Sequence, residues 1–187
     1  MESQKGQRKG KGAGAVKWVP PHREAYKANV DASMGKDRRR GVGVVVRNSR
    51  GEVRLAACKC IRADWEVDTT EAYAALYAMK LCWEAGIRRL ELETDSKTTA
   101  EALSRRKVLN NYTSIFIHDA GEMEGRFDVI SFSHVRRCAN MAAHELAKLA
   151  LQFDEEKTWF RDFPPSITAV IEGDKPCNQL PRAELCE

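Results

Sequence analysis

The chain has 187 residues, a length that favours one domain with a hydrophobic core of its own. Its formal net charge is +4, but residues 1–17 hold five basic residues and one acidic residue, so the rest of the chain is neutral overall. No apolar run is long enough to span a membrane, and the first residues are too basic for a secretory signal. These features exclude an integral membrane protein and predict an intracellular protein of the nucleus or the cytoplasm.

Residues 1–17 are predicted to form a disordered basic tail, because their glycine, lysine and glutamine residues cannot bury enough apolar surface to fold. Such a tail adds electrostatic affinity for nucleic acid, assists nuclear import or keeps the protein soluble, and the sequence leaves these alternatives open. The six cysteines show no zinc-site spacing, and we interpret them as reduced thiols.

Three successive strands are predicted after the entry segment Trp18–Pro21, whose tryptophan is expected to anchor it. Lys27–Ser33 alternates apolar and polar residues and carries Asp31 on its polar face. Gly41–Asn48 is rich in β-branched residues, and Glu52–Ile61 returns after a turn. Short connections between these strands imply antiparallel pairing.

The middle of the chain predicts a helix, a strand and two further helices. Glu71–Ala85 has apolar residues at helical spacing, with Glu71 in the first turn. Leu90–Asp95 alternates like a strand and feeds a helix that begins at Ser96. A third helix is expected over Thr113–Glu124.

The last third predicts a fifth strand over Phe127–Val135 and a helix for which Asn140 is the N-cap. Three aromatic residues beyond that helix are expected to fold back onto the core, and nothing after Gly173 indicates structure. The buried stripe of the helix and the three aromatic residues are, in order, Ala142, Leu146, Leu149 and Phe153, then Trp159, Phe160 and Phe163.

These elements predict an α/β fold, a mixed sheet with helices around it. The domain is expected to span residues 18–172, between the basic tail at 1–17 and an unstructured segment at 173–187.

Three acidic residues fall on three different predicted elements: Asp31, Glu71 and Asp95. Carboxylates that converge from separate elements suit Mg²⁺, which prefers oxygen ligands. Each residue also has a structural interpretation, since Asp31 precedes a turn, Glu71 stands three residues after Asp68 as in a capping box, and Asp95 precedes a helix. No serine, cysteine or histidine constellation competes with this trio as a catalytic site.

The motifs around these acids resemble those of the ribonuclease H family, and more narrowly the reverse-transcriptase-type domains of plant proteins and retroelements. The resemblance covers about residues 18–170 and rests on four segments: Asp31–Ser33, Thr70–Ala72, Glu93–Ser96 and Asn140–Ala147. It implies a five-stranded sheet in the order 3-2-1-4-5 with strands 1–3 antiparallel. It also implies a monomeric endonuclease that hydrolyses the RNA strand of RNA–DNA hybrids with two Mg²⁺ or Mn²⁺ ions.

Two positions depart from the family's pattern. His144 stands where many members have a fourth metal-site aspartate, and Ala32 stands where glycine is common. We therefore predict a catalytic and metal-binding set of Asp31, Glu71, Asp95 and His144. The alternative is a weak or inactive domain that keeps the fold and binds nucleic acid or a partner, and a related two-metal exonuclease fits the hairpin-rich start less well.

Nucleic acid is expected to contact Ser33, Arg136, Arg137 and Asn140. His134 is interpreted as a partly buried strand residue rather than as a proton shuttle. The basic run Lys36–Arg40 is equally well explained as phosphate contacts or as an exposed charged loop.

Overall fold

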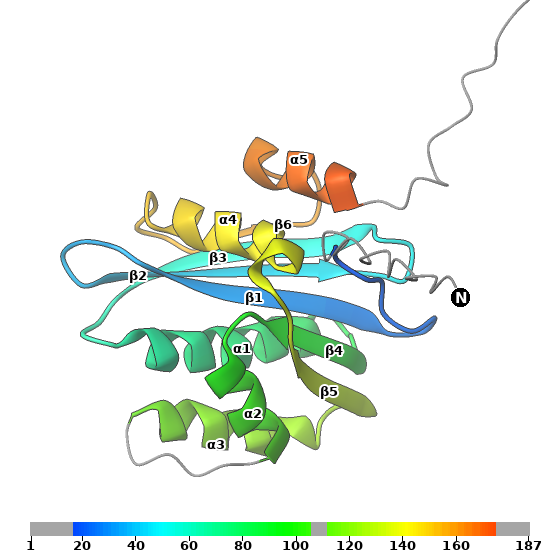
Figure 1. The fold of residues 1–187 in the computed structure, drawn as a ribbon, viewed down its shortest axis with the longest axis horizontal. Helices are drawn as coiled ribbons and strands as arrows, with labels where there is room; N and C mark the ends of the chain where they lie inside the picture. Colours follow the sequence, from blue (N-terminus) through cyan, green and yellow to red (C-terminus); the bar gives the residue numbers. More distant parts are fainter. Residues whose placement is uncertain (1–16, 106–111, 175–187) are drawn as a thin grey trace, which may run out of the picture.

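The computed structural model describes residues 17–105 and 112–174. The predictions of a disordered tail and of an unstructured end therefore fall mostly outside the described residues. The chain forms a mixed sheet in the order β5-β4-β1-β2-β3-β6 with helices on both faces (Figure 1). The predicted α/β class and the strand order 3-2-1-4-5 are confirmed, and a sixth strand extends the sheet at its β3 edge.

Strands β1 (Tyr26–Met34), β2 (Arg39–Arg47) and β3 (Val53–Arg62) pair antiparallel, as predicted. The turn between β1 and β2 is shorter than the charged loop expected from the sequence. Its residues Asp37 and Arg38 have positive φ angles of 52° and 57°, and the next two residues, Arg39 and Arg40, already belong to β2.

The parallel half of the sheet is formed by β4 (Arg89–Thr94), which pairs with β1, and β5 (Val129–His134), which pairs with β4. Helix α1 (Val67–Glu84) connects β3 to β4, and α2 (Lys97–Arg105) and α3 (Thr113–Glu124) connect β4 to β5. The capping-box interpretation of Glu71 is wrong. Helix α1 begins four residues earlier than Glu71, at Val67, and has no side-chain cap.

The chain then forms a short 3₁₀ turn η1 (Arg137–Ala139), helix α4 (Met141–Ala150), strand β6 (Lys157–Trp159) and helix α5 (Pro165–Asp174). Neither β6 nor α5 was predicted, and α5 runs just past Gly173, where the sequence indicated no structure. Trp159 and Phe163 do pack against the core, whereas Phe160 remains 64% exposed.

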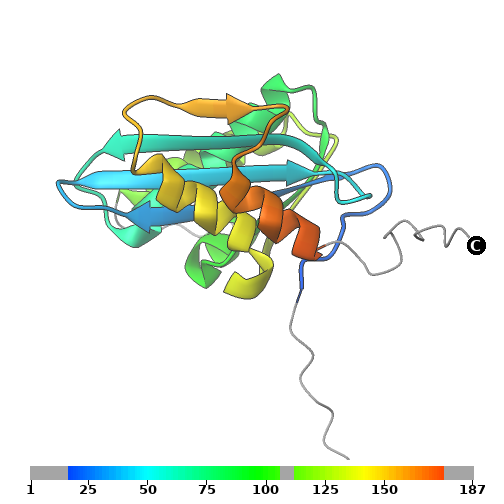
Figure 2. The ribbon, with the colours of Figure 1, turned by 90° about the horizontal axis from the view of Figure 1, so that it is seen from above.

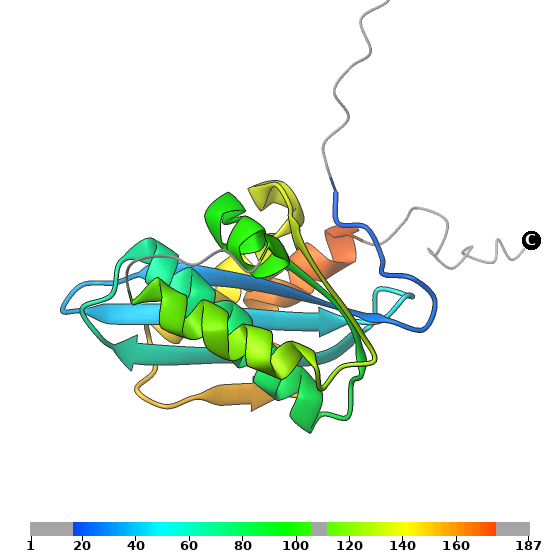
Figure 3. The ribbon, with the colours of Figure 1, turned by 90° about the horizontal axis from the view of Figure 1, so that it is seen from below.

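The helices form two layers around the sheet. From above, α4 and α5 lie across one face (Figure 2), and from below α1 and α3 cover the other (Figure 3). Helix α4 approaches β2 so closely that Gly41 and Gly43 have no room for a side chain. A Cβ atom at either position would overlap a carbonyl oxygen of α4, from Ala147 or Ala143. The α4 helix therefore closes tightly over the face of β1 and β2 that carries Asp31.

A network of paired charges is buried under α4 and α5, close to the start of β1. Lys27 Nζ lies 2.6 Å from Glu93 Oε1, and Asn29 donates a hydrogen bond of 3.0 Å to Glu93 Oε2. Arg47 donates to Asp174 at 2.7 Å and to Asn29 Oδ1 at 3.0 Å. Because every charge in this network has an opposite partner, the network can be buried at a tolerable cost in free energy.

Trp18 anchors the entry segment as predicted, and it does so on this network. Its side chain is 4% exposed, and the Arg47 guanidinium lies 3.7 Å from the ring centroid. Lys27 Nζ also donates to the Val19 carbonyl oxygen at 2.8 Å. The segment before β1 is therefore held by two contacts with buried cations.

Two further expectations concern cysteines and membranes. In the described part of the chain, Cys58, Cys60, Cys82 and Cys138 are free thiols. No described helix is both long and apolar enough to cross a bilayer.

Candidate metal centre

Asp31 lies in the middle of β1, on the face covered by α4, and is 1% exposed. The period-two alternation of the strand places it on the same face as Lys27 and Asn29. Its Oδ2 lies 2.6 Å from His144 Nδ1, while its Oδ1 is buried and has no hydrogen-bond partner in the described structure. A buried carboxylate oxygen without a partner is costly unless a ligand satisfies it.

Glu71 reaches the same point from the second turn of α1. Its Oε1 accepts a hydrogen bond from the Ala32 backbone N–H at 3.2 Å, and its Oε2 accepts one from the Thr94 hydroxyl at 3.3 Å. These two donors belong to β1 and β4, so they fix the carboxylate against both central strands. The side chain is fully positioned before any ligand arrives.

Asp95 follows directly after β4, at the carboxyl end of the strand, and it is less buried than the other two acids. Its Oδ2 lies 3.4 Å from Nε of Arg137, which belongs to η1. The Arg137 side chain is 62% exposed, so this ion pair is open to solvent and is expected to be weak.

His144 faces the acids, as predicted from its place in the first turn of α4. Its backbone N–H donates to the Asn140 carbonyl oxygen at 3.1 Å, and its side chain is 13% exposed. Besides its contact with Asp31, Nδ1 lies 3.3 Å from Nη2 of Arg137. His144 therefore borders the acid trio and links it to the loop before α4.

Burial and mutual repulsion keep the acids from ionising easily. Burial first, and then the Glu71 charge, raise the pKa of Asp31 from 3.8 to about 9. Burial and the Asp95 charge raise the pKa of Glu71 from 4.5 to about 7. Burial, followed by the nearby Arg137 charge, lowers the pKa of His144.

Asp31, Glu71 and Asp95 each offer one oxygen, and these three oxygens all lie within 4.8 Å of one another. Among the described residues, this is the only such group that meets the geometry of a metal site. Three carboxylates, one of them with a free buried oxygen, fit a hard divalent cation. A cation would also remove the repulsion that helps to raise the pKa values of Asp31 and Glu71.

The residues predicted to contact nucleic acid fall into two groups. Ser33 is partly exposed, and Arg136 and Arg137 are exposed beside the acids, so a substrate can reach all three. Asn140 is 1% exposed, and its amide donates to the Val30 carbonyl oxygen at 2.8 Å. It occupies the N-cap position without making a side-chain cap, and it ties α4 to β1 instead.

Two residues of this region differ from the sequence-based expectations. His134 lies on β5 as predicted, although the strand covers Val129–His134 rather than Phe127–Val135, and it is exposed rather than partly buried. Thr94 was missed, although it orients Glu71 and also accepts a hydrogen bond of 3.0 Å from the Ser96 N–H. Its position directly before Asp95 was the available signal, because strand-end hydroxyls often satisfy polar groups at a site.

Comparison with known families now adds to this geometry. A family model described as reverse transcriptase-like matches residues 29–150, which include all three acids and His144. No curated protein sequence matches the chain significantly.

Solved structures of several ribonucleases H are similar to this fold. The RNase H1 of the archaeon Halobacterium salinarum is 25% identical with a TM-score of 0.63, over 68% of this chain and 98% of that one. The N-terminal RNase H domain of a Mycobacterium tuberculosis protein is 20% identical with a TM-score of 0.62, over 68% and 94%. LC11-RNase H1, solved in complex with an RNA/DNA hybrid, is 18% identical with a TM-score of 0.62, over 68% and 96%.

Proposed function

Because the chain belongs to the reverse transcriptase-like family and is a ribonuclease H domain, we propose that it hydrolyses the RNA strand of RNA–DNA hybrids as an endonuclease. The family and the fold support the coarser function of nucleic-acid hydrolysis. The finer proposal rests on one observation, the convergence of three carboxylate oxygens within 4.8 Å beside exposed arginines.

Asp31, Glu71 and Asp95 are the residues that would hold divalent ions, Mg²⁺ or Mn²⁺, with two ions when substrate is bound. When bound, these ions supply an activated water and neutralise charge on the leaving oxygen of an in-line phosphoryl displacement. Thr94 and the Ala32 N–H keep Glu71 oriented for this task, since both already donate to its carboxylate. His144 is proposed as the fourth member of the site.

Arg137 and Arg136 are proposed to contact phosphate oxygens. Guanidinium groups donate two parallel hydrogen bonds to a phosphate and keep their charge at any physiological pH. Recognition of the hybrid would come from 2′-hydroxyls and groove shape rather than from base sequence. We further propose that the domain belongs to the plant and retroelement subgroup of the family. We also propose that it acts as a monomer, in the nucleus or the cytoplasm.

A second candidate function is nucleic-acid or partner binding without efficient catalysis. The observation that favours it is the contact of Asp31 with His144, an imidazole where many family members have a carboxylate. An imidazole adds no negative charge to the site, and Mg²⁺ prefers oxygen ligands. The two candidates differ in one outcome, which is whether the hybrid is cut.

The test is incubation of the purified chain with end-labelled RNA–DNA hybrid, single-stranded RNA and duplex DNA, each with Mg²⁺ or Mn²⁺. The proposal expects internal cuts in the RNA strand of the hybrid alone, and none when the metal is chelated. Binding of the hybrid without cleavage in either metal would favour the second candidate instead.

A further inference from the structure

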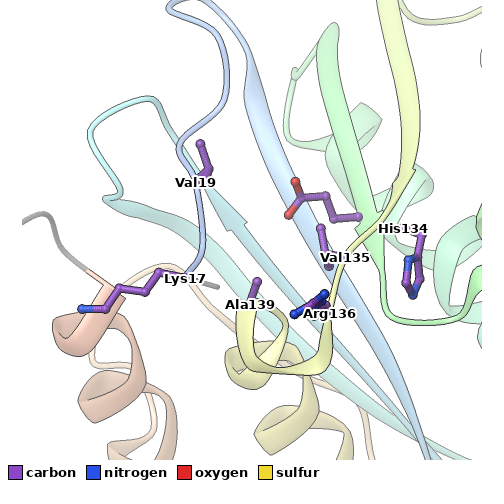
Figure 4. A pocket seen from close by; sticks show the side chains of 7 residues that line it. Lys17, Val19, His134, Val135, Arg136 and Ala139 are labelled. Atoms are coloured by element: carbon purple, nitrogen blue, oxygen red, sulfur yellow. The ribbon is translucent and has the colours of Figure 1, made fainter. Parts of the chain in front are cut away.

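A cavity that is distinct from the metal centre lies beside the acid trio, on the same side of the sheet. It has a volume of about 370 Å³ and is enclosed by the entry segment, the end of β5 and η1 (Figure 4). Val19 faces the loop that carries Arg136 and Ala139, with His134 at the far rim. Of the residues that line this cavity, the site proposed above uses only Arg136, and it uses none of the apolar walls.

The cavity and the acids are joined by two short stretches of chain. Glu93 lines the cavity and stands two residues before Asp95, so strand geometry separates the two positions by about 7 Å. Arg136 lines the cavity and precedes Arg137, which contacts Asp95. A duplex rises about 3.4 Å per nucleotide, so a strand seated on the acids passes the cavity within a few nucleotides.

The charges around the cavity favour an anion at its mouth. Arg136 is exposed and, among the described residues, makes neither an ion pair nor a side-chain hydrogen bond. The Lys17 side chain points away toward α5, where its amine lies 3.4 Å from the Gly173 carbonyl oxygen. Arg136 is therefore the cation available to a phosphate at this point.

The interior of the cavity suits a nucleobase. Val19, 65% exposed, together with Val135 and Ala139 supplies apolar surface for the face of a ring. Lys27 neutralises the charge of the Glu93 carboxylate and Asn29 donates a hydrogen bond to it, yet each oxygen keeps a lone pair that can accept from a base amino or imino group. The volume lies near the lower limit of small-molecule sites, enough for one nucleotide and too small for a base pair.

The wall formed by the entry segment is rigid. Trp18 is packed on Arg47, and the Val19 carbonyl oxygen accepts a hydrogen bond from buried Lys27. A wall held in place on both sides of Val19 loses little conformational entropy when a ligand binds.

We propose that this cavity binds one unpaired nucleotide of a strand that continues beyond the hybrid on the acid trio. The proposal rests on the proposed function only in that the acids mark where the hybrid lies. It implies that the protein prefers hybrids with a single-stranded extension to blunt hybrids.

The test measures binding rather than cleavage, by fluorescence anisotropy in EDTA. A blunt RNA–DNA hybrid is compared with hybrids whose single-stranded RNA extension grows one nucleotide at a time, at either end. The affinity is expected to rise by about tenfold at a single extension length and at one end, because one base then covers the apolar walls and one phosphate reaches Arg136. Arg136→Ala and Val19→Ser are expected to remove most of this step, whereas Arg54→Ala, an exposed arginine on β3, leaves it unchanged.

An affinity that stays flat, or rises equally with every nucleotide and persists in both cavity variants, would overturn the proposal. A second measurement needs no hybrid. Titration with a nucleoside 5′-monophosphate should shift the amide resonances of Val19, Glu93 and Ala139 and not those near Arg54, and an absence of shifts at the cavity would also overturn it. Loss of the proposed function appears separately, as no cleavage in the presence of metal.

Discussion

Two groups of buried charges lie on the same face of β1 and are arranged in opposite ways. In one group, Lys27 pairs with Glu93 and Arg47 pairs with Asp174. Asn29 links the two ion pairs, because it donates a hydrogen bond to Glu93 and accepts one from Arg47. Two residues further along the strand, Asp31 faces other acids, and its Oδ1 has no partner among the described residues.

The difference shows how burial alone does not define a site. Paired charges beneath α4 and α5 hold the entry segment and the C-terminal helix onto the sheet, so they serve stability. Like charges gathered around Asp31 oppose folding, and their presence is explained by a ligand that brings positive charge.

The largest expected effect on stability comes from breaking the paired network. Arg47→Ala removes a guanidinium that contacts Asp174, Asn29 and the Trp18 ring, and it leaves Asp174 without its opposite charge. We expect the free energy of unfolding to fall by about 4 kcal/mol. Urea denaturation followed by circular dichroism measures this, with the exposed Arg54→Ala as the matched control.

The control should change stability by less than about 0.5 kcal/mol. If both arginine variants lose the same small amount, the network does not stabilise the fold in the way described.

The acid trio makes the opposite prediction for the dependence of stability on pH. The folded protein holds protons on Asp31 and Glu71 up to pKa values of about 9 and about 7, whereas the unfolded chain releases them near 3.8 and 4.5. The contribution of these two groups to the free energy of unfolding is therefore fully present below about pH 4, and it is lost as the pH rises through 7 and 9. We expect the free energy of unfolding to fall between pH 5 and pH 9 when no metal is present.

Thermal unfolding in EDTA across this range measures the loss. Mg²⁺ or Mn²⁺ should restore stability at high pH, because a bound cation replaces the protons. A melting temperature that rises with pH in EDTA would contradict the assigned pKa shifts.

Of the two charge groups, the acid trio could be predicted from the sequence, whereas the paired network could not. Asp31 was found because the strand alternates and because Glu71 and Asp95 fall on other elements. The orientation of His144 followed from helical spacing after Asn140. The sequence did not predict that Lys27 and Arg47 are buried and paired with acidic residues. Charged residues on the polar face of a strand give no sign that helices will cover that face.

The missed elements have equally specific causes. Strand β6 has three residues, too few for alternation to be recognised. No helix was predicted after Phe163, yet Pro165 is the first residue of α5, a position that proline favours. The contact of Arg137 with Asp95 depends on the path of η1, which no local pattern encodes.

A smaller effect is expected on the choice of metal ion at the acid trio. His144 contributes an imidazole, which suits borderline transition metals better than Mg²⁺. We predict that Mn²⁺ supports hybrid cleavage better than Mg²⁺, and that His144→Asp raises the Mg²⁺ rate selectively, by about tenfold. Steady-state cleavage by both proteins in each metal measures this. An unchanged ratio of the Mn²⁺ and Mg²⁺ rates would place His144 outside the metal site.

The smallest effect concerns the basic residues before the domain. Deleting residues 1–17 removes five basic residues and one acidic residue. The affinity for any nucleic acid should become weaker and less dependent on salt, while the preference for hybrid stays the same. Affinities measured over a range of salt concentrations provide the slope, and an unchanged slope would show that the tail does not contact phosphates.

The central claim is that the buried carboxyl group of Asp31, whose Oδ1 has no hydrogen-bond partner among the described residues, belongs to a metal site that hydrolyses hybrids. Asp31→Asn keeps the shape of the side chain and removes its charge, so one variant tests both parts of the claim. We predict that this variant cleaves a labelled RNA–DNA hybrid at least about a thousandfold more slowly than the wild type. It should also unfold at a higher temperature in EDTA, whereas Asp128→Asn, at an exposed acid directly before β5, behaves as wild type in both assays. Cleavage by Asp31→Asn at the wild-type rate would contradict the account.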